Sequence, residues 1–192
     1  MAKSQFMLVG ASNHTDKERV QDDYYATDPA AIDYLLSGGA KLSHDLWECA
    51  CGEGHLSKKL TELGYNVTST DLIYRGFGVG GVDFLQQTSV FDGDIITNPP
   101  FDKGLEFVKH ALELVRPGQK IFMFLKLCFL EGQKRRALFD NGQLKTVYVS
   151  SKRMSCASNG EFGKYKAGSA IAYAWFEFEK GYKGDPVIKW IN

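Results

Sequence analysis

The sequence predicts an α/β fold in which a doubly wound, mostly parallel sheet ends in an antiparallel pair of strands. Apolar, β-branched runs alternate with amphipathic helical segments up to about residue 140, which is typical of parallel strands joined by helices. A glycine-rich turn at 52–54 joins the first of these strands to a helix, as in nucleotide-binding folds. The last two strands follow one another with no helical pattern between them, so we expect them to pair antiparallel.

Local signals place each element in turn. Thr27 or Asp28 is expected to cap the first helix, Pro29 suits its first turn, and Gly38-Gly39 ends it. A nearly continuous apolar run at 120–125 is expected of a strand that is covered on both faces. We therefore expect helices at 30–36, 55–63, 105–115 and 131–140. We expect strands at 45–50, 66–71, 94–97, 120–125, 144–149 and 169–179.

The bulk composition predicts one ordinary globular domain, in which residues 1–22 form a peripheral segment. Of the 192 residues, 23 are basic and 23 acidic, so the net charge is zero and nucleic-acid binding has to rest on a local basic patch. The four cysteines form neither a Cys-x-x-Cys pair nor a secreted disulfide framework. The amino terminus lacks the apolar run of a signal peptide, and no stretch is apolar enough to span a membrane. We expect a cytoplasmic protein without a separate target-recognition domain.

The most informative stretch is the strand at 94–97 with the loop that follows it, Asn98-Pro99-Pro100-Phe101. Two successive prolines cannot donate to a sheet ladder, and each disfavours helix in the residue before it. The strand is therefore expected to end abruptly and to present a stiff loop at its carboxyl end, the edge at which open α/β sheets bind ligands. An ordinary strand-ending turn would account for the prolines alone.

The turn between the first strand and its helix suits a nucleotide-like ligand without phosphates. Gly52-Glu53-Gly54 lacks the third glycine of the dinucleotide fingerprint, and Glu48 and Glu53 would repel a diphosphate. Asp71, at the end of the next strand, is positioned to accept ribose hydroxyls, although a strand-end turn explains it equally well. A ligand with a positive charge and a ribose fits this pattern, and S-adenosylmethionine is such a ligand.

Five short motifs occur in order between residues 22 and 180: Tyr25-Ala-Thr27-Asp-Pro29, Glu48-Cys-Ala-Cys-Gly52-Glu-Gly54, Thr70-Asp71, Asp83-Phe84 and Asn98-Pro99-Pro100-Phe101. With these motifs the chain resembles the S-adenosylmethionine-dependent amino-methyltransferases, in particular the small DNA adenine methyltransferases of phages and prophages. The Asn-Pro-Pro-aromatic motif is fairly specific for methylation of a planar nitrogen, but it does not specify which nitrogen.

This resemblance implies a Rossmann-like class I methyltransferase fold, a single domain over 1–192, and S-adenosylmethionine as the cofactor. It implies that Thr27 lies at the methionine end of the cofactor, that Asp71 holds the ribose, and that Asp83 and Phe84 meet the adenine. Cys49 stands where the family more often has proline, and we expect this change to be tolerated. The implied cofactor-binding residues are Tyr25, Thr27, Glu48, Ala50, Cys51, Gly52, Gly54, Asp71, Leu72, Asp83, Phe84 and Asn98.

The loop suits methyl transfer to an exocyclic amine, which is a weak nucleophile because its lone pair is delocalised into the ring. The Asn98 side-chain oxygen and the Pro99 carbonyl are two acceptors that can draw the amine towards tetrahedral geometry and free that lone pair. Phe101 is expected to stack on a base swung out of its duplex. The predicted reaction is methylation of adenine N6 in DNA, with Asn98, Pro99, Pro100 and Phe101 as the catalytic residues.

Contacts to nucleic acid are expected from basic residues outside the motifs. The segment 150–169, which is polar and contains glycine and lysine, is a candidate recognition hairpin that enters a groove. Lys126 follows a strand on the ligand-binding edge, near the expected target. Solvated helix and hairpin faces account for most of these charges equally well. The candidate substrate-binding residues are Lys126, Lys134, Arg135, Arg136, Lys152, Arg153 and Lys166.

Other interpretations of the sequence stay open. Asn-Pro-Pro-Phe also occurs in enzymes that methylate guanine N2 of ribosomal RNA, relatives with tyrosine modify glutamine in proteins, and RNA adenine N6 is a further target. A non-catalytic S-adenosylmethionine-binding or partner-binding module is the alternative from another class, although it has no need of a stiff amine clamp. No cysteine follows a proline, which argues against methylation at cytosine carbon 5, and Cys49-Ala50-Cys51 has the wrong spacing for zinc, so we expect no metal. We expect either a short recognition sequence or a protein partner.

Overall fold

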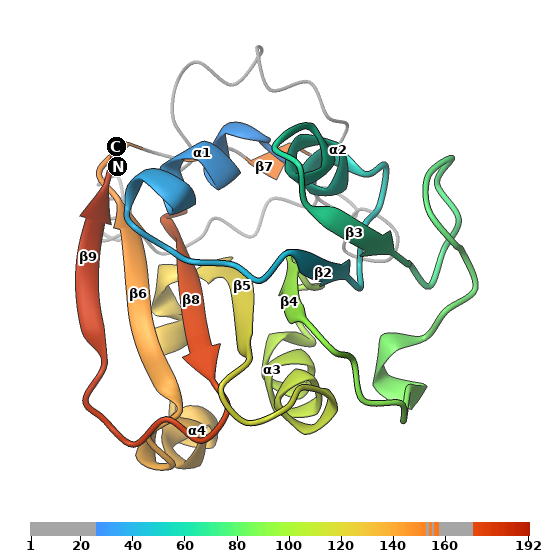
Figure 1. Cartoon of the computed structure of the whole chain (residues 1–192). Coiled ribbons are helices and arrows are strands. Elements are labelled where there is room, and N and C mark those ends of the chain that lie inside the picture. The colour runs from blue at the N-terminus through green and yellow to red at the C-terminus, as the bar shows by residue number, and fades with distance from the viewer. Residues whose placement is uncertain (1–25, 153, 155, 158–170) are drawn as a thin grey trace, which may run out of the picture.

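A computed structural model of the protein describes residues 26–152, 154, 156–157 and 171–192 (Figure 1). The α-helices described are α1 (Ala30–Ser37), α2 (His55–Glu62), α3 (Gly104–Leu114) and α4 (Arg136–Asp140). The strands described are β1 (Ala26–Thr27), β2 (Asp45–Glu48), β3 (Asn66–Ser69), β4 (Asp94–Thr97), β5 (Lys120–Lys126), β6 (Leu144–Ser150), β7 (Cys156–Ala157), β8 (Tyr173–Glu179) and β9 (Val187–Ile191). Short 3₁₀ helices lie at Phe84–Gln86, Leu127–Leu130 and Gln133–Arg135. Within this part of the chain, no helix is both long and apolar enough to cross a bilayer.

Seven of these strands form one sheet, whose directions agree with the predicted doubly wound arrangement. The strand order is β3-β2-β4-β5-β8-β6-β9 (Figure 1). β3, β2, β4 and β5 run parallel to one another, whereas β8 runs antiparallel to both of its neighbours, β5 and β6. The prediction of a mostly parallel sheet that contains an antiparallel pair of late strands is confirmed. The edge strand β9, which pairs parallel to β6, is absent from that prediction.

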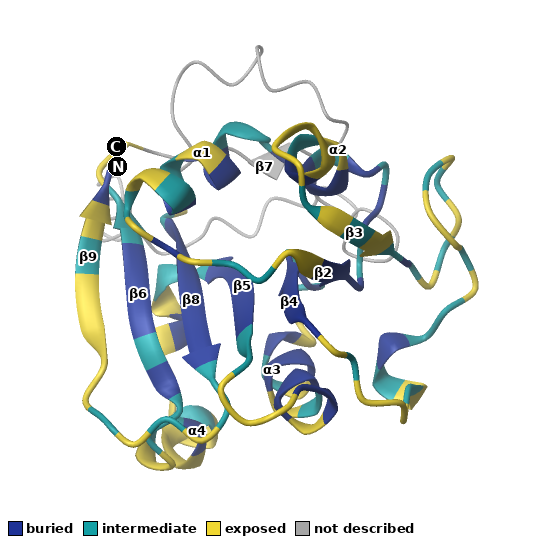
Figure 2. Cartoon of the chain, in the orientation of Figure 1, coloured by how far each residue is buried: buried dark blue, intermediate teal, exposed yellow. Residues whose placement is uncertain are grey.

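Different helices cover the two faces of the sheet, and the strands alternate their side chains between them. α1 and α2 pack on one face, and α3 packs on the other (Figure 1). Along β5, Ile121 and Met123 belong to the buried cluster under α3, whereas Phe122 and Phe124 belong to the cluster under α1 and α2. Figure 2 shows β4, β5 and β8 buried along most of their length, as expected for strands that are covered on both faces. This layered packing fixes the carboxyl ends of the parallel strands relative to one another.

Most predicted boundaries agree with the structure to within two residues, and the exceptions have physical causes. β2 and β3 end two residues early, at Glu48 and Ser69, where the chain leaves the sheet for two turns. The predicted helix at 131–140 is a 3₁₀ turn followed by α4, because Gly132 has a φ angle of 111°, which lies outside the helical region. The predicted strand at 169–179 begins at Tyr173 among the described residues.

Of the two residues predicted to cap α1, Asp28 binds the first turn of the helix, whereas Thr27 belongs to a short strand. Asp28, one of the two predicted caps, accepts the backbone N–H of Ala30 through Oδ1 at 2.9 Å. Thr27, the other, lies in β1, which pairs antiparallel with β7. This ladder joins the start of the described chain to the predicted recognition hairpin at 150–169. Most of that hairpin lies outside the described residues, as does the predicted peripheral segment 1–22.

The carboxylate of Asp94 ties the amino ends of two strands to the loop before β2. Asp94 is buried at the start of β4, where Oδ1 accepts the backbone N–H of Lys120 at 2.7 Å and Oδ2 accepts that of Ser43 at 2.8 Å. The Ser43 hydroxyl in turn accepts the N–H of Asp94 at 2.8 Å. Because hydrogen bonds to charged groups are stronger than neutral ones, this side chain helps to set the register in which β4 and β5 begin.

Replacement Asp94→Ala is expected to lower the free energy of unfolding by about 2–4 kcal/mol, because two partly buried backbone N–H groups lose their acceptor. Denaturant unfolding followed by circular dichroism measures this loss. The matched control is Asp92→Ala, which removes an exposed carboxylate two residues away. It is expected to change the stability by less than about 0.5 kcal/mol. Equal losses for the two variants would contradict the role given to Asp94.

Candidate functional site

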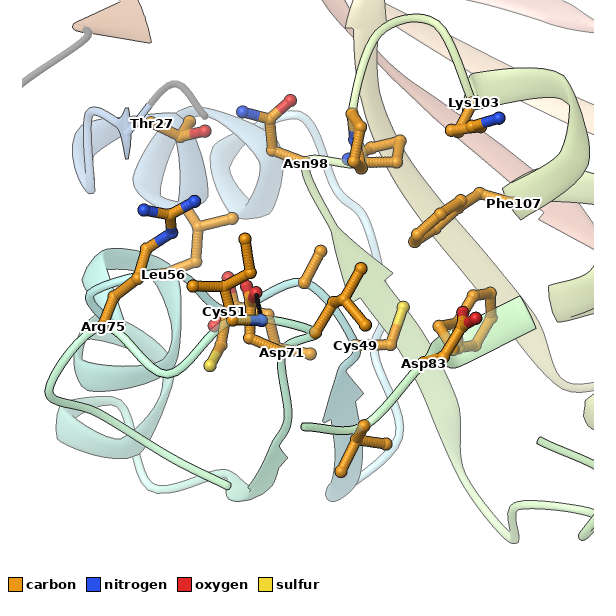
Figure 3. Close-up of a pocket in the computed structure, with 18 of the residues that line it drawn as sticks. Thr27, Cys49, Cys51, Leu56, Asp71, Arg75, Asp83, Asn98, Lys103 and Phe107 are labelled. Carbon is orange, nitrogen blue, oxygen red and sulfur yellow. Dashed lines mark hydrogen bonds between the residues drawn. The ribbon is translucent and has the colours of Figure 1, made fainter. Parts of the chain in front are cut away.

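The carboxyl ends of β2, β3 and β4 surround a cavity of about 330 Å³ (Figure 3). β3 and β4 flank β2 on opposite sides, so the chain order reverses at this point, which is where open α/β sheets bind ligands. The predicted catalytic residues that line the cavity are Asn98, Pro99, Pro100 and Phe101. The predicted cofactor-binding residues that line it are Thr27, Glu48, Ala50, Cys51, Asp71, Leu72, Asp83, Phe84 and Asn98.

The Asn98 loop leads from β4 into α3 and holds two hydrogen-bond acceptors in a fixed backbone. The Pro100 carbonyl accepts the N–H of Lys103 at 2.9 Å, which begins the turn into the helix. Among the described residues, no backbone N–H donates to the Pro99 carbonyl. The side-chain oxygen of Asn98 is buried, and the side chain borders the cavity (Figure 3). The loop can therefore present an amide oxygen and a carbonyl oxygen to a ligand.

Phe101 stands at the end of a row of aromatic rings. Its ring is tilted against that of Tyr173 at a centroid distance of 5.6 Å, and Tyr173 stacks on Phe124 at 5.3 Å. The ammonium of Lys126 lies over the Phe101 ring, 4.5 Å from its centroid. The structure thus brings Lys126, one of the predicted substrate-binding residues, to the same part of the site as the Asn98 loop.

Glu48, the last residue of β2, carries a carboxyl group that is removed from solvent. The hydroxyl of Ser57 donates to its Oε2, and the hydroxyls of Ser57 and Ser69 share a hydrogen bond of 2.6 Å. Burial raises the pKa of Glu48 to about 8; the hydrogen bonds from Ser57 oppose this increase, and the charge of Asp71 adds to it. An ionised Glu48 is therefore unfavourable until a cation lies beside it.

Asp71 joins the two turns on one side of the cavity. Its Oδ2 accepts the N–H of Gly52 at 2.8 Å, and its Oδ1 accepts that of Ile73 at 2.9 Å. These bonds hold the turn after β2 against the turn after β3. Because each carboxylate oxygen has a further lone pair, Asp71 can still accept two hydroxyl groups of a ligand.

Gly52 and Gly54, which the sequence analysis assigned to cofactor binding, are not among the residues that line the cavity. Their φ angles are 54° and 77°, a backbone conformation that lets the chain turn sharply from β2 into α2. A Cβ atom on Gly54 would lie 2.2 Å from the ring of Phe77, so only glycine lets the loop after β3 close over this turn. The two glycines shape the wall of the cavity.

Thr27 and Asp83 border the cavity at different places. The Thr27 hydroxyl is buried and has no hydrogen-bond partner among the residues that the structure describes. The Asp83 Oδ1 accepts the N–H of Leu85 at 3.0 Å and so caps a short 3₁₀ helix. Phe84 beside it is 2% exposed, since its ring packs against the core. Tyr25, also assigned to the cofactor, lies outside the described residues.

The other basic residues assigned to the substrate do not line this cavity. Arg135 donates to the carbonyls of Phe129 at 2.7 Å and Cys128 at 3.2 Å, so its guanidinium holds its own turn. Arg136 pairs with Asp140 at 2.7 Å on α4, which precedes β6 and lies at the opposite end of the sheet from the cavity (Figure 1).

The remaining predicted substrate-binding residues are either exposed or outside the described residues. Lys134 is exposed in the turn before α4, and Lys152 is exposed just after β6, at the carboxyl end of that strand. Arg153 and Lys166 lie outside the described residues. Among the described members of the predicted substrate-binding residues, Lys126 is therefore the one that contacts a residue of the cavity, the ring of Phe101.

Several residues that line the cavity are not predicted from the sequence, among them Arg75, Lys103, His55 and Leu56. Arg75 lies four residues after Asp71, in a glycine-rich loop that has no helical or strand periodicity. Asp71 could have pointed to Arg75, because the loop that follows an acidic residue at a strand end borders the same edge of the sheet.

Comparisons with known proteins identify the fold. No model of a known protein family matches the chain, and no curated protein matches it. The type I restriction–modification methyltransferase subunit from Streptococcus thermophilus superposes with a TM-score of 0.59 at 14% identity, covering 87% of this chain and 47% of that one. A Listeria monocytogenes protein, provisionally described as a class I S-adenosylmethionine-dependent methyltransferase, has a TM-score of 0.58 at 12% identity, covering 91% and 67%. A Pyrococcus horikoshii protein, provisionally described as an RNA methyltransferase, has a TM-score of 0.51 at 17% identity, covering 79% and 84%.

At such identities these likenesses establish the fold alone. The chain has the class I methyltransferase fold, as predicted. It spans less than half of the restriction–modification subunit, 47% of its length, and 67% of the Listeria protein.

Replacement Glu48→Gln is expected to stabilise the empty protein, increasingly so as the pH rises. The pKa of Glu48 is about 8 in the folded protein against an ordinary 4.5, so between these values the folded state keeps a proton that the unfolded state releases. Wild-type stability therefore falls as the pH rises through this interval, whereas glutamine mimics the protonated carboxyl group. Melting temperatures of the two proteins should converge near about pH 4 and diverge towards about pH 8. A gap independent of pH would contradict burial as the cause.

Proposed function

We propose that this chain is an S-adenosylmethionine-dependent methyltransferase that methylates an exocyclic amine of a nucleic-acid base, with N6 of adenine in DNA as the favoured target. One observation carries the proposal: a single cavity combines two sets of groups. Thr27, Glu48 and Asp71 suit a cationic nucleoside, and Asn98 and Phe101 suit a planar amine. The fold of the chain supports this combination, because proteins described as methyltransferases share it.

The residues of the cavity fit S-adenosylmethionine better than a nucleotide that carries phosphates. The buried carboxyl group of Glu48 offers a negative charge to a ligand cation. Asp71 has lone pairs for two ribose hydroxyls, and the buried Thr27 hydroxyl is available to a polar group of the ligand. A pyrophosphate would instead be repelled by Asp71 and Asp83, and it would offer no cation to the buried carboxyl group of Glu48.

S-adenosylmethionine, when bound, supplies an electrophilic methyl carbon. The contribution of the protein is to make the acceptor amine nucleophilic. The Asn98 side-chain oxygen and the Pro99 carbonyl accept the two N–H groups of the amine, which localises the nitrogen lone pair. Because the two prolines hold these acceptors in place, little reorganisation is needed at the moment of transfer. No covalent bond to the protein is required.

The target base has to leave its duplex to reach the Asn98 loop, since the reacting nitrogen is inaccessible within the stack. Phe101 provides an aromatic surface for the extruded base. Lys126 places a positive charge over this ring, where a backbone phosphate of the bound strand can meet it. These two side chains therefore support a nucleic-acid base as the substrate.

DNA is favoured over RNA because the five motifs resemble those of small DNA adenine methyltransferases, and a restriction–modification subunit shares the fold. RNA is the second candidate, because a protein provisionally described as an RNA methyltransferase also shares the fold. A protein partner for target recognition belongs to the DNA proposal, because the restriction–modification protein that shares the fold is described as a subunit.

The test of this proposal follows a radiolabelled methyl group from S-adenosylmethionine into unmethylated DNA, with total RNA and a protein extract in parallel. We expect nucleoside analysis to identify N6-methyladenine in DNA. Label in RNA alone would move the assignment to the second candidate. Label in protein alone would overturn the proposal.

In the same assay, Asn98→Ala is expected to lower kcat by about 100- to 1,000-fold, because it removes one of the two acceptors for the amine. Its affinity for S-adenosylhomocysteine, measured by calorimetry, should fall by far less than kcat, because Thr27, Glu48 and Asp71 remain in place. The matched control is Asn66→Ala, which alters an exposed asparagine on β3 and should retain full activity. Undiminished turnover in Asn98→Ala would contradict the amine clamp.

Phe101→Ala is expected to lower kcat/KM for DNA by about 5- to 150-fold, since stacking on an aromatic ring contributes about 1–3 kcal/mol per base. Phe101→Tyr keeps the ring and should retain most of the activity. Steady-state kinetics on one DNA substrate compare the two variants with the wild type. If both variants lose the same activity, the ring does not act by stacking.

A further inference from the structure

Arg75 introduces a positive charge into a cavity whose other charged lining groups are mostly acidic. Glu48, Asp71 and Asp83 line the same cavity, and they suit the positive and hydroxyl-bearing parts of the proposed cofactor. S-adenosylmethionine also carries one negative group, the α-carboxylate of its methionine moiety. None of the three acidic residues can bind that group, so it requires a cation or a cluster of N–H donors.

The loop that carries Arg75 is folded back onto the end of β3. The N–H of Asp71 donates to the carbonyl of Val79 at 3.0 Å, which closes the loop on either side of Arg75. Further along the loop, the ring of Phe77 packs against Gly54. A Cβ atom at position 54 would collide with this ring. The backbone that carries Arg75 is thus held by the hydrogen bond between Asp71 and Val79 and by the packing of Phe77 on Gly54.

The position of Arg75 matches the order of groups along the cofactor. The residue is half-buried, and its Nε atom is buried. Figure 3 shows the guanidinium on the side of the cavity that carries Thr27 and Leu56, with Asp71 between Arg75 and Asp83. In S-adenosylmethionine the ribose lies between the adenine and the amino acid. If Asp83 meets the adenine and Asp71 the ribose, the amino-acid end points towards Arg75.

We propose that Arg75 binds the α-carboxylate of the cofactor, with its planar guanidinium donating two hydrogen bonds to the two carboxylate oxygens. This inference rests on the proposed function. Together with Glu48, which suits the ammonium, Arg75 would recognise both charges of the amino-acid end. The site would then discriminate against adenosine derivatives that lack an amino acid. A guanidinium suits this task better than an ammonium, because its fork matches carboxylate geometry.

The other two basic residues that line the cavity are less suited to this task. Lys103 lies beside Phe107, on the opposite side of the labelled set from Arg75 (Figure 3). The imidazole of His55, whose Nε2 lies 3.1 Å from the Oε2 of Glu53, lacks the two-pronged fork that matches a carboxylate. Lys103 therefore serves as the matched control, a cation that borders the same cavity at another place.

Two ligands that differ only in the carboxylate test the proposal: S-adenosylhomocysteine and its decarboxylated analogue, S-adenosyl-3-thiopropylamine. Calorimetry on the full chain measures both affinities. Arg75→Ala is expected to lower the affinity for S-adenosylhomocysteine by about 10- to 100-fold. It should lower the affinity for the analogue by less than about twofold. Arg75→Lys should fall between, because it keeps the charge without the fork. Lys103→Ala should leave the ratio of the two affinities unchanged.

The assignment of Arg75 would be overturned if a folded Arg75→Ala variant lost the same affinity for both ligands. It would also be overturned if the variant lost affinity for neither. Circular dichroism identifies a variant that fails to fold, and Arg75→Lys then provides the comparison. A wild-type protein that binds neither ligand would overturn the proposed function itself. The two failures are therefore distinguishable without any measurement of methyl transfer.

Discussion

A carboxyl group in a dry interior is stable only when it is protonated or lies beside a cation, and Glu48 is such a group. It stands at the end of β2, where the order of the chain in the sheet reverses. The hydroxyl of Ser57 on α2 donates to it, and the hydroxyl of Ser69 on β3 shares a hydrogen bond with that of Ser57. Glu48 is therefore expected to keep its proton near neutral pH, and the cationic cofactor proposed above would favour its ionised form. Destabilising groups of this kind persist in proteins mainly where a ligand restores the balance.

Local sequence signals identify the fold wherever one residue type constrains the backbone. The strand 94–97 is predicted to the residue, because the two prolines after it cannot continue a ladder. The edge strand β9 escapes such reasoning, since Pro186 precedes it and Val187, Ile188 and Trp190 are exposed, which removes the alternation expected of a half-buried strand. Pairing at an edge is decided by the neighbouring strand, which the local pattern does not reveal.

The residues of the candidate site likewise fall into those that local sequence signals predict and those that tertiary contacts bring into place. Glu48, Asp71 and Asn98 are predictable because the carboxyl ends of parallel strands meet at one edge. Arg75 enters the cavity only through the closure of a glycine-rich loop, and that closure depends on a contact between Phe77 and Gly54 that no local pattern encodes. The sequence likewise reveals the charge of Arg135, but the carbonyls that engage this guanidinium belong to a tertiary arrangement.

The place of β8 in the sheet has a consequence for synthesis of the protein on the ribosome. β8 lies between β5 and β6 and pairs with both, yet it comes from the last quarter of the chain. Until it emerges, both neighbours present open edges, and the core lacks Trp175, Phe176 and Phe178. The central layer of the sheet therefore cannot form until residues 173–179 have left the ribosome, well after both of its neighbouring strands.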